Sequence, residues 1–286
     1  MKGHEVNLKW SVRRRLEHID LLLAWDGYFG RQQLTDFFDI SEPQASADIK
    51  LYQEKAVGNI IYNMNKKRYE PSTEFEPYFL NISSQRHLNS LYLRESGVID
   101  DSLFPYSFRP PVEILTVARS APSSDLLFAI IRAIRTKKYF SANYQSMTRE
   151  ELSRRNLAPH AIFWSNNNWY IRAHCLLRQD YINLSIPRIR TFEFSDENAP
   201  DQNDDKKWNQ KIRVNIRPHS LLSEAQQKAV ALEFGMRGAK KVFEVRKCLL
   251  FFFVNSQNLN PTKYSDKPKE ALIEIENWSD VETYYQ

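Results

Sequence analysis

The segment NNNWYIRAHC, residues 166–175, combines an aromatic run with basic side chains. Because side chains alternate across a β-strand, Tyr170, Arg172 and His174 are expected to share one face. The opposite face would be apolar, with Trp169, Ile171, Ala173 and Cys175. An arginine guanidinium is a planar fork of N–H donors that matches phosphate and carboxylate groups. One face is therefore predicted to close a core, and the basic groups on the other could be solvated or could bind an anion.

Residues 41–52 carry side chains suited to reading DNA. Ser41 can serve as an N-cap, Glu42 adds first-turn negative charge and Pro43 suits the first turn, so a helix is predicted to begin here. Its buried stripe would be Ala45, Ile49 and Tyr52, and its outward arc would be Gln44, Ser46, Ala47 and Lys50. Glutamine can pair with an adenine edge, alanine can touch a thymine methyl group, and serine or lysine can reach a base or a phosphate.

Two earlier helices and a hairpin are predicted to position this helix. The first carries apolar residues at helical spacing: Val12, Leu16, Ile19 and Leu23. The second is RQQLTDFF, residues 31–38, with Leu34, Phe37 and Phe38 inward. A helix, a tight turn and a helix make a helix-turn-helix, whose last helix enters the major groove. NIIYNMNKKRYE, residues 59–70, then predicts a hairpin whose basic tip would lie on phosphates as a wing.

The predicted DNA contacts of residues 1–75 are thus Arg31, Ser41, Gln44, Ser46, Lys50, Lys66, Lys67 and Arg68. Arg13, Arg14 and Arg15 form a second basic cluster. An alternative stays open, because these residues hold 11 Lys/Arg against 11 Asp/Glu. Three helices and a hairpin could then be a protein-docking module with solvated charges.

The composition excludes several other classes. The 286 residues suit two or three soluble domains, and no apolar run is long enough to span a membrane. The beginning, MKGHEVNLKW, lacks a signal-peptide core, so we expect a cytoplasmic protein. Cys175 and Cys248 are expected to be buried, reduced thiols. No dinucleotide, P-loop, His-Glu-x-x-His or Gly-x-Ser-x-Gly motif occurs, so we expect no catalytic residues, no metal and no cofactor.

The net charge of +5 arises in the middle of the chain. Residues 112–195 hold 12 Lys/Arg against 6 Asp/Glu, whereas residues 76–111 hold 3 against 4 and residues 196–286 hold 14 against 14. A solvated surface is one explanation of this excess, and an anion-binding surface is the other.

Residues 76–111 read as a connector, with an amphipathic helix at 86–95 and a stretch stiffened by Pro105, Pro110 and Pro111. A helix at 126–134 follows. Four short strands are then predicted at 139–146, 159–165, 169–175 and 181–189, which together indicate a small β-barrel.

A polar linker, residues 196–209, separates this region from a last domain at 210–286. Ile212, Val214 and Ile216 alternate as a strand, and Ser223-Glu-Ala-Gln226 opens a helix with a capping box that ends near Gly235. The run CLLFFFV, residues 248–254, is too apolar to be exposed, but its periodicity fits a buried strand or a helix. A simple core is one admissible interpretation of this run.

The stretch LAPHAIFWSNNNWYIRAHCLLRQDYINLSIPRI, residues 157–189, resembles a WYL domain. Its namesake tripeptide is Trp169, Tyr170 and Ile171, with Ile in the place of Leu. VNIRPHSLLSEAQQKAVALEFGM and VFEVRKCLLFFF resemble the C-terminal domain of WYL regulators of the BrxR and CapW type. The resemblance implies an α+β chain: an N-terminal winged helix-turn-helix, a central Sm-like or SH3-like β-barrel and a small C-terminal α/β dimerisation domain.

The same resemblance implies a ligand pocket on the polar face of the barrel. The matching positions are Tyr144, Ser146, His160, Tyr170, Arg172 and Arg188. One departure concerns the last strand, where the family often has an Arg-x-Phe element and this chain has Ile182, Asn183 and Leu184. Part of the pocket chemistry is thus missing or supplied by other residues.

The sequence therefore predicts a homodimeric, ligand-responsive transcription regulator that binds an inverted-repeat operator in double-stranded DNA. The resemblance implies an autorepressor of a phage-defence operon, and the basic excess implies an anionic effector such as a nucleotide or a nucleic-acid fragment. A module that binds RNA or single-stranded DNA through the Sm-like barrel is the alternative. A hydrolase using His160 and Ser146 is a third, weaker possibility.

Overall fold

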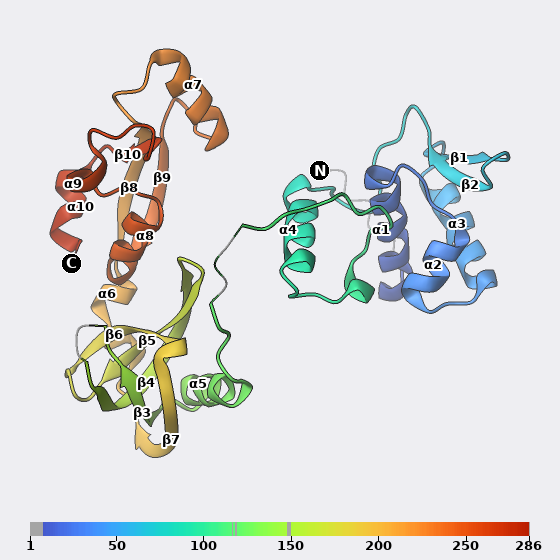
Figure 1. The fold of residues 1–286 in the computed structure, drawn as a ribbon. Helices are drawn as coiled ribbons and strands as arrows, with labels where there is room; N and C mark the ends of the chain where they lie inside the picture. The colour runs from blue at the N-terminus through green and yellow to red at the C-terminus, as the bar shows by residue number, and fades with distance from the viewer. Residues whose placement is uncertain (1–7, 116, 118, 148–149, 286) are drawn as a thin grey trace. The chain divides into compact units, whose positions relative to one another are not determined.

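The computed structural model describes residues 8–115, 117, 119–147 and 150–285 (Figure 1). Residues 1–7, on which the expectation of no signal peptide partly rests, lie outside them. The chain forms two compact units, residues 1–116 and 117–286. Among the described residues, no helix has both the length and the apolar character needed to cross a bilayer.

Three helices and a hairpin make the core of the first unit, as predicted. They are α1 Trp10–Trp25, α2 Arg31–Phe38, α3 Glu42–Lys55 and the antiparallel pair β1 Ile60–Asn63 and β2 Arg68–Pro71. The predicted inward residues of α3 are buried, as are most of those of α1 and Leu34 of α2. The prediction that Phe37 is buried is wrong: it is 37% exposed and stacks on His18 of α1 at 4.3 Å at the margin of the core.

A buried polar network fixes α1 against α3 and against the chain that follows the hairpin. Asp20 accepts hydrogen bonds from the Tyr52 hydroxyl at 2.6 Å and from the backbone N–H groups of Phe79 and Leu80. Burial raises the pKa of Asp20, while these donors act to lower it. Residues far apart in sequence are thereby held in one arrangement.

The predicted connector packs onto the first unit and adds to its structure. It contains α4 Ser84–Glu95 and the 3-10 turn η1 Asp101–Leu103. Leu91, Phe104 and Tyr106 form a small core to which Leu21 and Trp25 of α1 contribute. The proline stretch therefore begins inside this unit.

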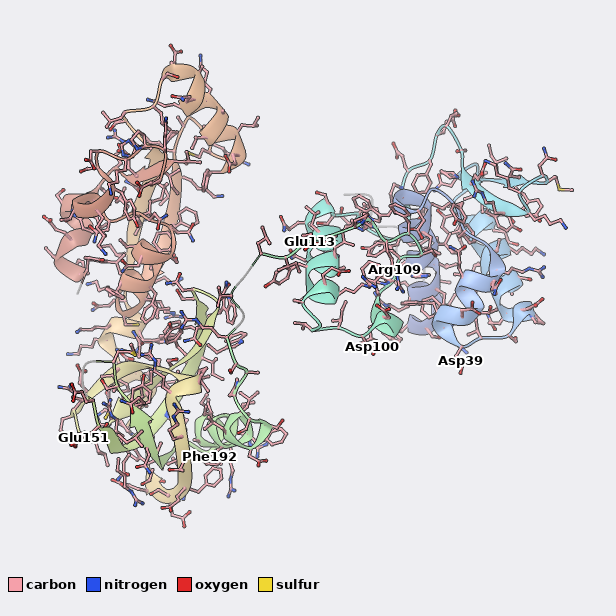
Figure 2. The ribbon with its side chains drawn as sticks, in the orientation of Figure 1. Asp39, Asp100, Arg109, Glu113, Glu151 and Phe192 are labelled. Carbon is pink, nitrogen blue, oxygen red and sulfur yellow. The ribbon has the colours of Figure 1, made fainter. Side chains whose placement is uncertain are left out.

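The second unit opens with α5 Ser124–Thr136 and a five-stranded antiparallel sheet. The strands are β3 Lys138–Gln145, β4 Leu152–Ser165, β5 Asn168–Cys175, β6 Asp180–Ser185 and β7 Ile189–Asn198, with the 3-10 turn η2 Ile186–Arg188 between the last two. Their order is β6-β5-β4-β3-β7. The predicted barrel closure is not confirmed, because β6 and β7 are edge strands that do not pair within the described residues. Helix α5 packs on one face of the sheet, and Phe192 of β7 contacts the same core (Figure 2).

The two faces of β5 differ as the alternation predicted, with one exception. Ile171, Ala173 and Cys175 have no exposed surface and lie in the core beneath α5. Trp169 is 46% exposed instead of buried, because it lies at the hairpin end and contacts Trp164 across the turn.

The predicted linker is ordered and leads into the C-terminal sheet. It contains the 3-10 turn η3 Gln202–Asp204 and α6 Lys206–Asn209. The elements that follow are β8 Lys211–Pro218, α7 Glu224–Glu233, β9 Lys241–Arg246, η4 Lys247–Leu249, α8 Leu250–Ser256, α9 Pro261–Tyr264, β10 Ile273–Ile275, α10 Trp278–Val281 and η5 Glu282–Tyr284. The strand order is β10-β8-β9.

Two sequence expectations for this domain are resolved. The capping box at Ser223 and Gln226 is present, and α7 ends at Glu233 as predicted. The apolar run 248–254 is helical in α8, where Leu250 and Val254 are buried but Phe251 is 46% exposed. Cys175 is a buried free thiol, whereas Cys248 is only partly buried.

Candidate nucleic-acid interface and effector site

A hollow of about 440 Å³ lies between α2, α3 and the β1–β2 hairpin. Four of the predicted DNA contacts line it: Arg31, Ser46, Lys50 and Lys67. Arg31 starts α2, and its Nη1 donates to the Ser46 hydroxyl at 3.4 Å. The geometry thus brings cationic groups from the two helices and the wing around one concave surface.

The other predicted contacts of α3 lie at its N-terminal end. Ser41 caps the helix by accepting from the Gln44 backbone N–H at 3.4 Å, so this oxygen already has a partner. Gln44 is exposed, yet its Nε2 donates to Asp48 Oδ1 at 3.2 Å. Asp48 itself is only 2% exposed.

The three basic residues at the tip of the β1–β2 hairpin differ in their ion pairing. Arg68 is bound by Glu70 at 2.6 Å and lies over the Tyr28 ring at 4.1 Å. Lys66 also pairs with Glu70, at 3.5 Å. Hydrogen bonds from Asn63 and then from Arg68 lower the pKa of Glu70, which keeps it charged. Lys67 adopts a left-handed φ of 51° at the turn and points its side chain to the hollow.

The second basic cluster, residues 13–15, does not present three free cations. Arg13 and Arg14 both pair with Glu17 on the solvent side of α1. Arg15 is turned inward and pairs with Asp48, with Nε to Oδ2 at 2.6 Å. Helical spacing explains this split, since consecutive residues on a helix point in different directions.

A second cavity, of about 540 Å³, opens on the edge strand β6 of the central sheet. Its lining combines cations with polar and apolar groups: Tyr144, Ser146, Met147, Arg155, Arg178, Asp180, Ile182, Asn183, Leu184 and Arg188. Three of the six predicted ligand residues, Tyr144, Ser146 and Arg188, are among them. The positions that depart from the family element, 182–184, form one wall.

Sequence reasoning missed two of the cations in this cavity. Arg155 of β4 is 5% exposed, lies over the Tyr144 ring at 4.9 Å and donates to the Ser153 hydroxyl. Arg178 follows β5 and is exposed. In the part of the chain that the structure describes, no carboxylate forms an ion pair with Arg155, Arg178 or Arg188. Strand alternation could have indicated Arg155, since it follows Ser153 by two residues on a strand opposite Tyr144.

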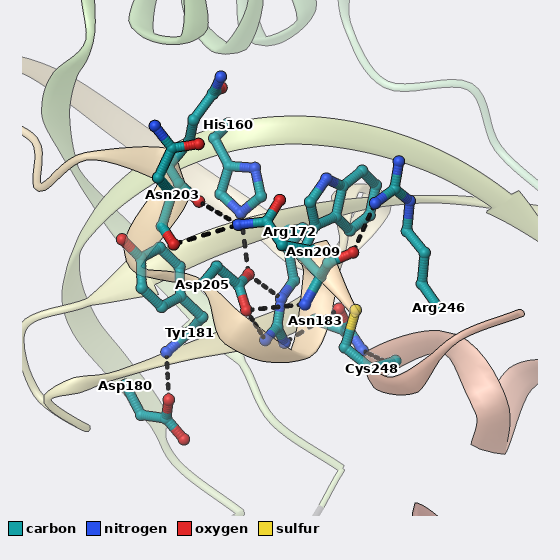
Figure 3. Close-up of polar contacts among 12 residues, drawn as sticks. His160, Arg172, Asp180, Tyr181, Asn183, Asn203, Asp205, Asn209, Arg246 and Cys248 are labelled. Carbon is teal, nitrogen blue, oxygen red and sulfur yellow. Dashed lines mark hydrogen bonds and ion pairs between the residues drawn. The ribbon is translucent and has the colours of Figure 1, made fainter. Parts of the chain in front are cut away.

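The remaining predicted ligand residues lie elsewhere. Arg172 and His160 meet at Asp205 of the linker, a residue that sequence reasoning did not single out (Figure 3). Arg172 donates from Nε and Nη2 to the two Asp205 oxygens at 2.7 and 2.9 Å, and His160 donates from Nε2 at 3.0 Å. Both members of the Arg172–Asp205 pair are almost fully buried. This geometry gives Arg172 a structural partner and argues against its prediction as a direct ligand contact.

The pKa of Asp205 is set by its burial together with its hydrogen-bond and charge partners. Burial by itself raises the pKa of the carboxyl, but hydrogen bonds from His160 and Arg172 and the charge of Arg172 lower it by more. The net result is a pKa well below the ordinary 3.8. Asp205 also caps α6 by accepting from the Trp208 N–H, so one carboxylate ties the linker to β4 and β5.

Asn183 connects the cavity to this cluster and to the C-terminal domain. Its Oδ1 accepts from Arg172 Nη1 at 3.4 Å, and its Nδ2 donates to the Cys248 carbonyl oxygen at 2.8 Å. Tyr170, the sixth predicted ligand residue, stacks on Phe163 at 5.0 Å and meets Phe252 of α8 edge-on at 4.8 Å. The polar face of β5 is thus covered by the linker and the C-terminal domain.

Comparison with known proteins assigns each of these regions to a family model. Residues 11–92 match the winged helix-turn-helix domain of the BrxR transcriptional regulator, 125–194 match the WYL domain, and 211–281 match the BrxR C-terminal dimerization domain. The DNA-binding transcriptional repressor CapW of Pseudomonas aeruginosa is 32% identical, over 100% of this chain and 95% of its own. The chain belongs to the BrxR and CapW family of transcriptional regulators.

Other relatives in this family are CapW of Stenotrophomonas maltophilia, 31% identical over 97% of this chain and 93% of its own, and CapW of Escherichia coli strain KTE188, 30% identical over 98% and 93%. The BrxR winged-helix match extends to residue 92 and so includes α4, which the sequence analysis assigned to a separate connector. The family consists of transcription regulators, in agreement with the prediction that the chain is not an enzyme.

Proposed function

We propose that this protein is a dimeric transcriptional repressor that binds an inverted-repeat operator and responds to an anionic effector. Helix α3 would enter the major groove, the β1–β2 hairpin would lie on phosphates and residues 210–286 would join two copies. The names of the relatives favour repression over activation. A phage-defence operon is proposed from the family resemblance alone, and a cytoplasmic location agrees with the role of a DNA-binding repressor.

The observation that carries DNA binding is the hollow between α2, α3 and the wing. Arg31, Lys50 and Lys67 surround it, while Ser46 supplies a hydroxyl on the same side of α3. A concave surface with cations on its rim suits a duplex, because phosphate contacts orient the protein and side chains on the helix reach base edges.

The test of this part is binding to the duplex directly upstream of the gene over a series of salt concentrations. Replacing Lys66, Lys67 and Arg68 together by alanine should weaken binding to upstream and to shuffled DNA alike and should flatten the salt dependence. Arg13→Ala is the matched control, since it removes an exposed cation of α1 that pairs with Glu17. Unchanged affinity and salt slope in the triple variant would contradict a wing on phosphates.

Dimerisation is tested by removing residues 210–286. Recognition of an inverted repeat needs two recognition helices separated by whole turns of DNA, about 10 bp or a multiple. The truncated chain should lose much more affinity for the upstream duplex than for random DNA. A truncated chain that is still a dimer and binds normally would place the dimer contacts elsewhere. Because Asn183 and Tyr170 contact the removed domain, its folding is checked by circular dichroism.

The effector site would be the cavity on β6. Arg155, Arg178 and Arg188 converge on it without an ion-pair partner among the described residues, and Tyr144 offers a ring beside them. Arginine forks bind phosphate and aromatic rings stack on bases, which favours a nucleotide or a short nucleic-acid fragment. Such a ligand alters repression only if it binds the DNA-competent and incompetent states with different affinity.

Calorimetric titration with mononucleotides and short oligonucleotides tests the effector class. Arg188→Ala should weaken binding at least about tenfold, as expected for a lost charge-assisted contact. Arg154→Ala is the control, because Arg154 neighbours Arg155 in sequence but pairs with Glu193 and does not line the cavity. Equal effects of the two variants would exclude the cavity as the site.

A second candidate function is binding of RNA or single-stranded DNA by the central sheet. Trp164 and Trp169, at 50% and 46% exposure, lie at the tip of the β4–β5 hairpin, and exposed aromatic rings can stack on unpaired bases. If this were the main activity, Trp164→Ala would weaken oligonucleotide binding more than Arg188→Ala, and the upstream duplex would have no advantage over random duplex.

A further inference from the structure

A buried ion pair lies beneath the exposed N-terminal part of α3. Asp48, 2% exposed, accepts from Arg15 of α1 in two places: Nε to Oδ2 at 2.6 Å and Nη2 to Oδ1 at 3.1 Å. Gln44 lies one turn before Asp48, and its Nε2 donates to the same Oδ1 at 3.2 Å. One carboxylate therefore holds the neighbouring helix and the exposed Gln44 side chain together.

The chemistry of this partner decides which way the Gln44 amide faces. A carboxylate paired with arginine only accepts hydrogen bonds, so the group that Gln44 turns towards Asp48 must be its NH₂. The carbonyl Oε1 is then directed away from Asp48, and one N–H of the amide stays free. A glutamine on a bare helix surface could present either end.

We propose that Asp48, held by Arg15, is a positioning residue that makes Gln44 select adenine in the operator. This inference rests on the proposed function, because it assumes that α3 lies in the major groove. Adenine presents an N7 acceptor and an N6 amino donor, which the free N–H and Oε1 of Gln44 match. Guanine presents two acceptors, so its O6 would meet the Oε1 of Gln44 unfavourably.

The fixed amide also reduces the cost of binding. A long exposed side chain loses rotamer freedom when it is ordered against a base, and a side chain ordered beforehand loses less. Ser46 differs in this respect: its contact with Arg31 leaves a hydroxyl that can rotate to donate or accept. We therefore expect a sharp base preference at the Gln44 position and a weaker one at the Ser46 position.

The experiment measures the base preference of the full chain on upstream duplexes in which one position at a time is randomised. Wild type should favour adenine over guanine at one position in each half-site by about tenfold or more. Gln44→Ala should abolish the preference at that position alone, and the control Ser46→Ala should leave it in place. A Gln44→Ala protein that keeps every preference overturns the proposal.

The positioning role is tested by Asp48→Asn combined with Arg15→Gln, which removes both charges together. The amide introduced at 48 can donate to Oε1, so Gln44 can turn its NH₂ outward towards the two acceptors of guanine. The variant should bind guanine nearly as well as adenine at that position, with unchanged preferences elsewhere. A folded variant with the wild-type profile overturns the proposal.

Modified operators give the same test without any substitution in the protein. At the selected adenine, 7-deazaadenine removes the N7 acceptor and purine removes the N6 amino group. Each should weaken wild-type binding severalfold, because the fixed amide uses both atoms. If either change is without effect, the proposal is wrong. If wild type shows no preference for any sequence, the proposed function itself fails, which is a different result.

Discussion

Each of the two units contains a buried arginine–aspartate pair, and the two pairs differ in what else the carboxylate binds. Asp48 joins α1 to α3 through Arg15 and also binds the exposed side chain of Gln44. Asp205 joins β5 to the linker through Arg172 and also binds His160, whose side chain is only 10% exposed. The first pair thus supports a surface that can meet DNA. The second pair is bonded to interior groups and stabilises the packing of the linker on the central sheet.

A buried arginine in a binding domain can thus affect binding through the carboxylate to which it is bonded. Neither Arg15 nor Arg172 can approach a ligand directly, because each guanidinium is already bound by a carboxylate. We expect their effects on function to differ, because Gln44 is exposed at the surface whereas the contacts of Asp205 are internal. Substitutions at the two pairs should therefore separate stability from recognition.

The largest effect is expected from Arg172→Ala. Removing one member leaves Asp205 as an uncompensated buried charge, which costs about 3–5 kcal/mol of unfolding free energy. Denaturant unfolding of the full chain should show this loss in the transition of residues 117–286. Arg154→Ala, which breaks an exposed pair with Glu193, should cost less than about 1 kcal/mol. Equal stabilities of the two variants would show that Asp205 is not an anchor.

Arg15→Ala should have a smaller effect on stability, about 3 kcal/mol, because α1 and α3 also share a hydrophobic core. Its distinguishing result is on recognition: the preference for upstream over shuffled duplex should fall even under conditions where the protein is fully folded. Arg172→Ala at matched stability should retain that preference. A loss of preference in both variants would remove the distinction between the two pairs.

Acid should weaken the two units over different ranges of pH. Burial, and then the charge of Arg14, lower the pKa of His18 from 6.5 to about 4. As the pH falls, His18 is therefore protonated in the unfolded chain before it is protonated in the folded chain. The first unit should lose stability as the pH falls from about 6.5 towards 4, by up to about 1.4 kcal/mol per pH unit. The lowered pKa of Asp205 means that its contribution is full above 3.8 and is lost only below that value.

Hydrogen exchange followed at several pH values measures this separation, because amides of α1 and of β5 report the two units. His18→Phe should reduce the loss above pH 4 in α1 and leave β5 unchanged; His87, whose pKa burial also lowers, accounts for what remains. Simultaneous loss of protection in both units near pH 5 would show that these groups do not set the acid response.

The smallest effect is expected from Lys67→Ala. Lys67 borders the hollow beside α3, and a single phosphate contact changes the slope of log affinity against log salt by about one. Lys66 pairs with Glu70, so Lys66→Ala should change the slope less. Fluorescence anisotropy over a salt series distinguishes the two variants. A larger slope change for Lys66→Ala would contradict the view that Lys67 is the more available of the two lysines.

The helices of the first unit could be predicted from the sequence because their signals are local. The Ser41 cap, the stripe of Ala45, Ile49 and Tyr52, and the basic hairpin tip are all read from neighbouring residues. The direction of Arg15 and the partner of Gln44 were not predicted, since both depend on Asp48 being buried against another helix.

The central region was harder to predict for the same reason. Alternation along β5 correctly separated its two faces, but it could not show that Asp205, 33 residues later, covers the polar one. The polar composition of residues 196–209 indicates a linker, but it does not indicate that the Asp205 side chain is almost fully buried. The cavity is assembled from β3, β4, β6, η2 and the turn that carries Arg178, so no single sequence motif predicts the whole set of its cations.

The most direct test of the account is the relative affinity of the full chain for its upstream duplex and for a shuffled duplex of the same composition, measured with wild type and with Gln44→Ala combined with Ser46→Ala. Wild type should prefer the upstream duplex strongly. The variant should lose most of that preference and keep its affinity for shuffled DNA, because base contacts determine sequence preference while phosphate contacts supply affinity for any sequence. Equal loss on both duplexes, or a wild type without preference, would contradict recognition of an operator through α3.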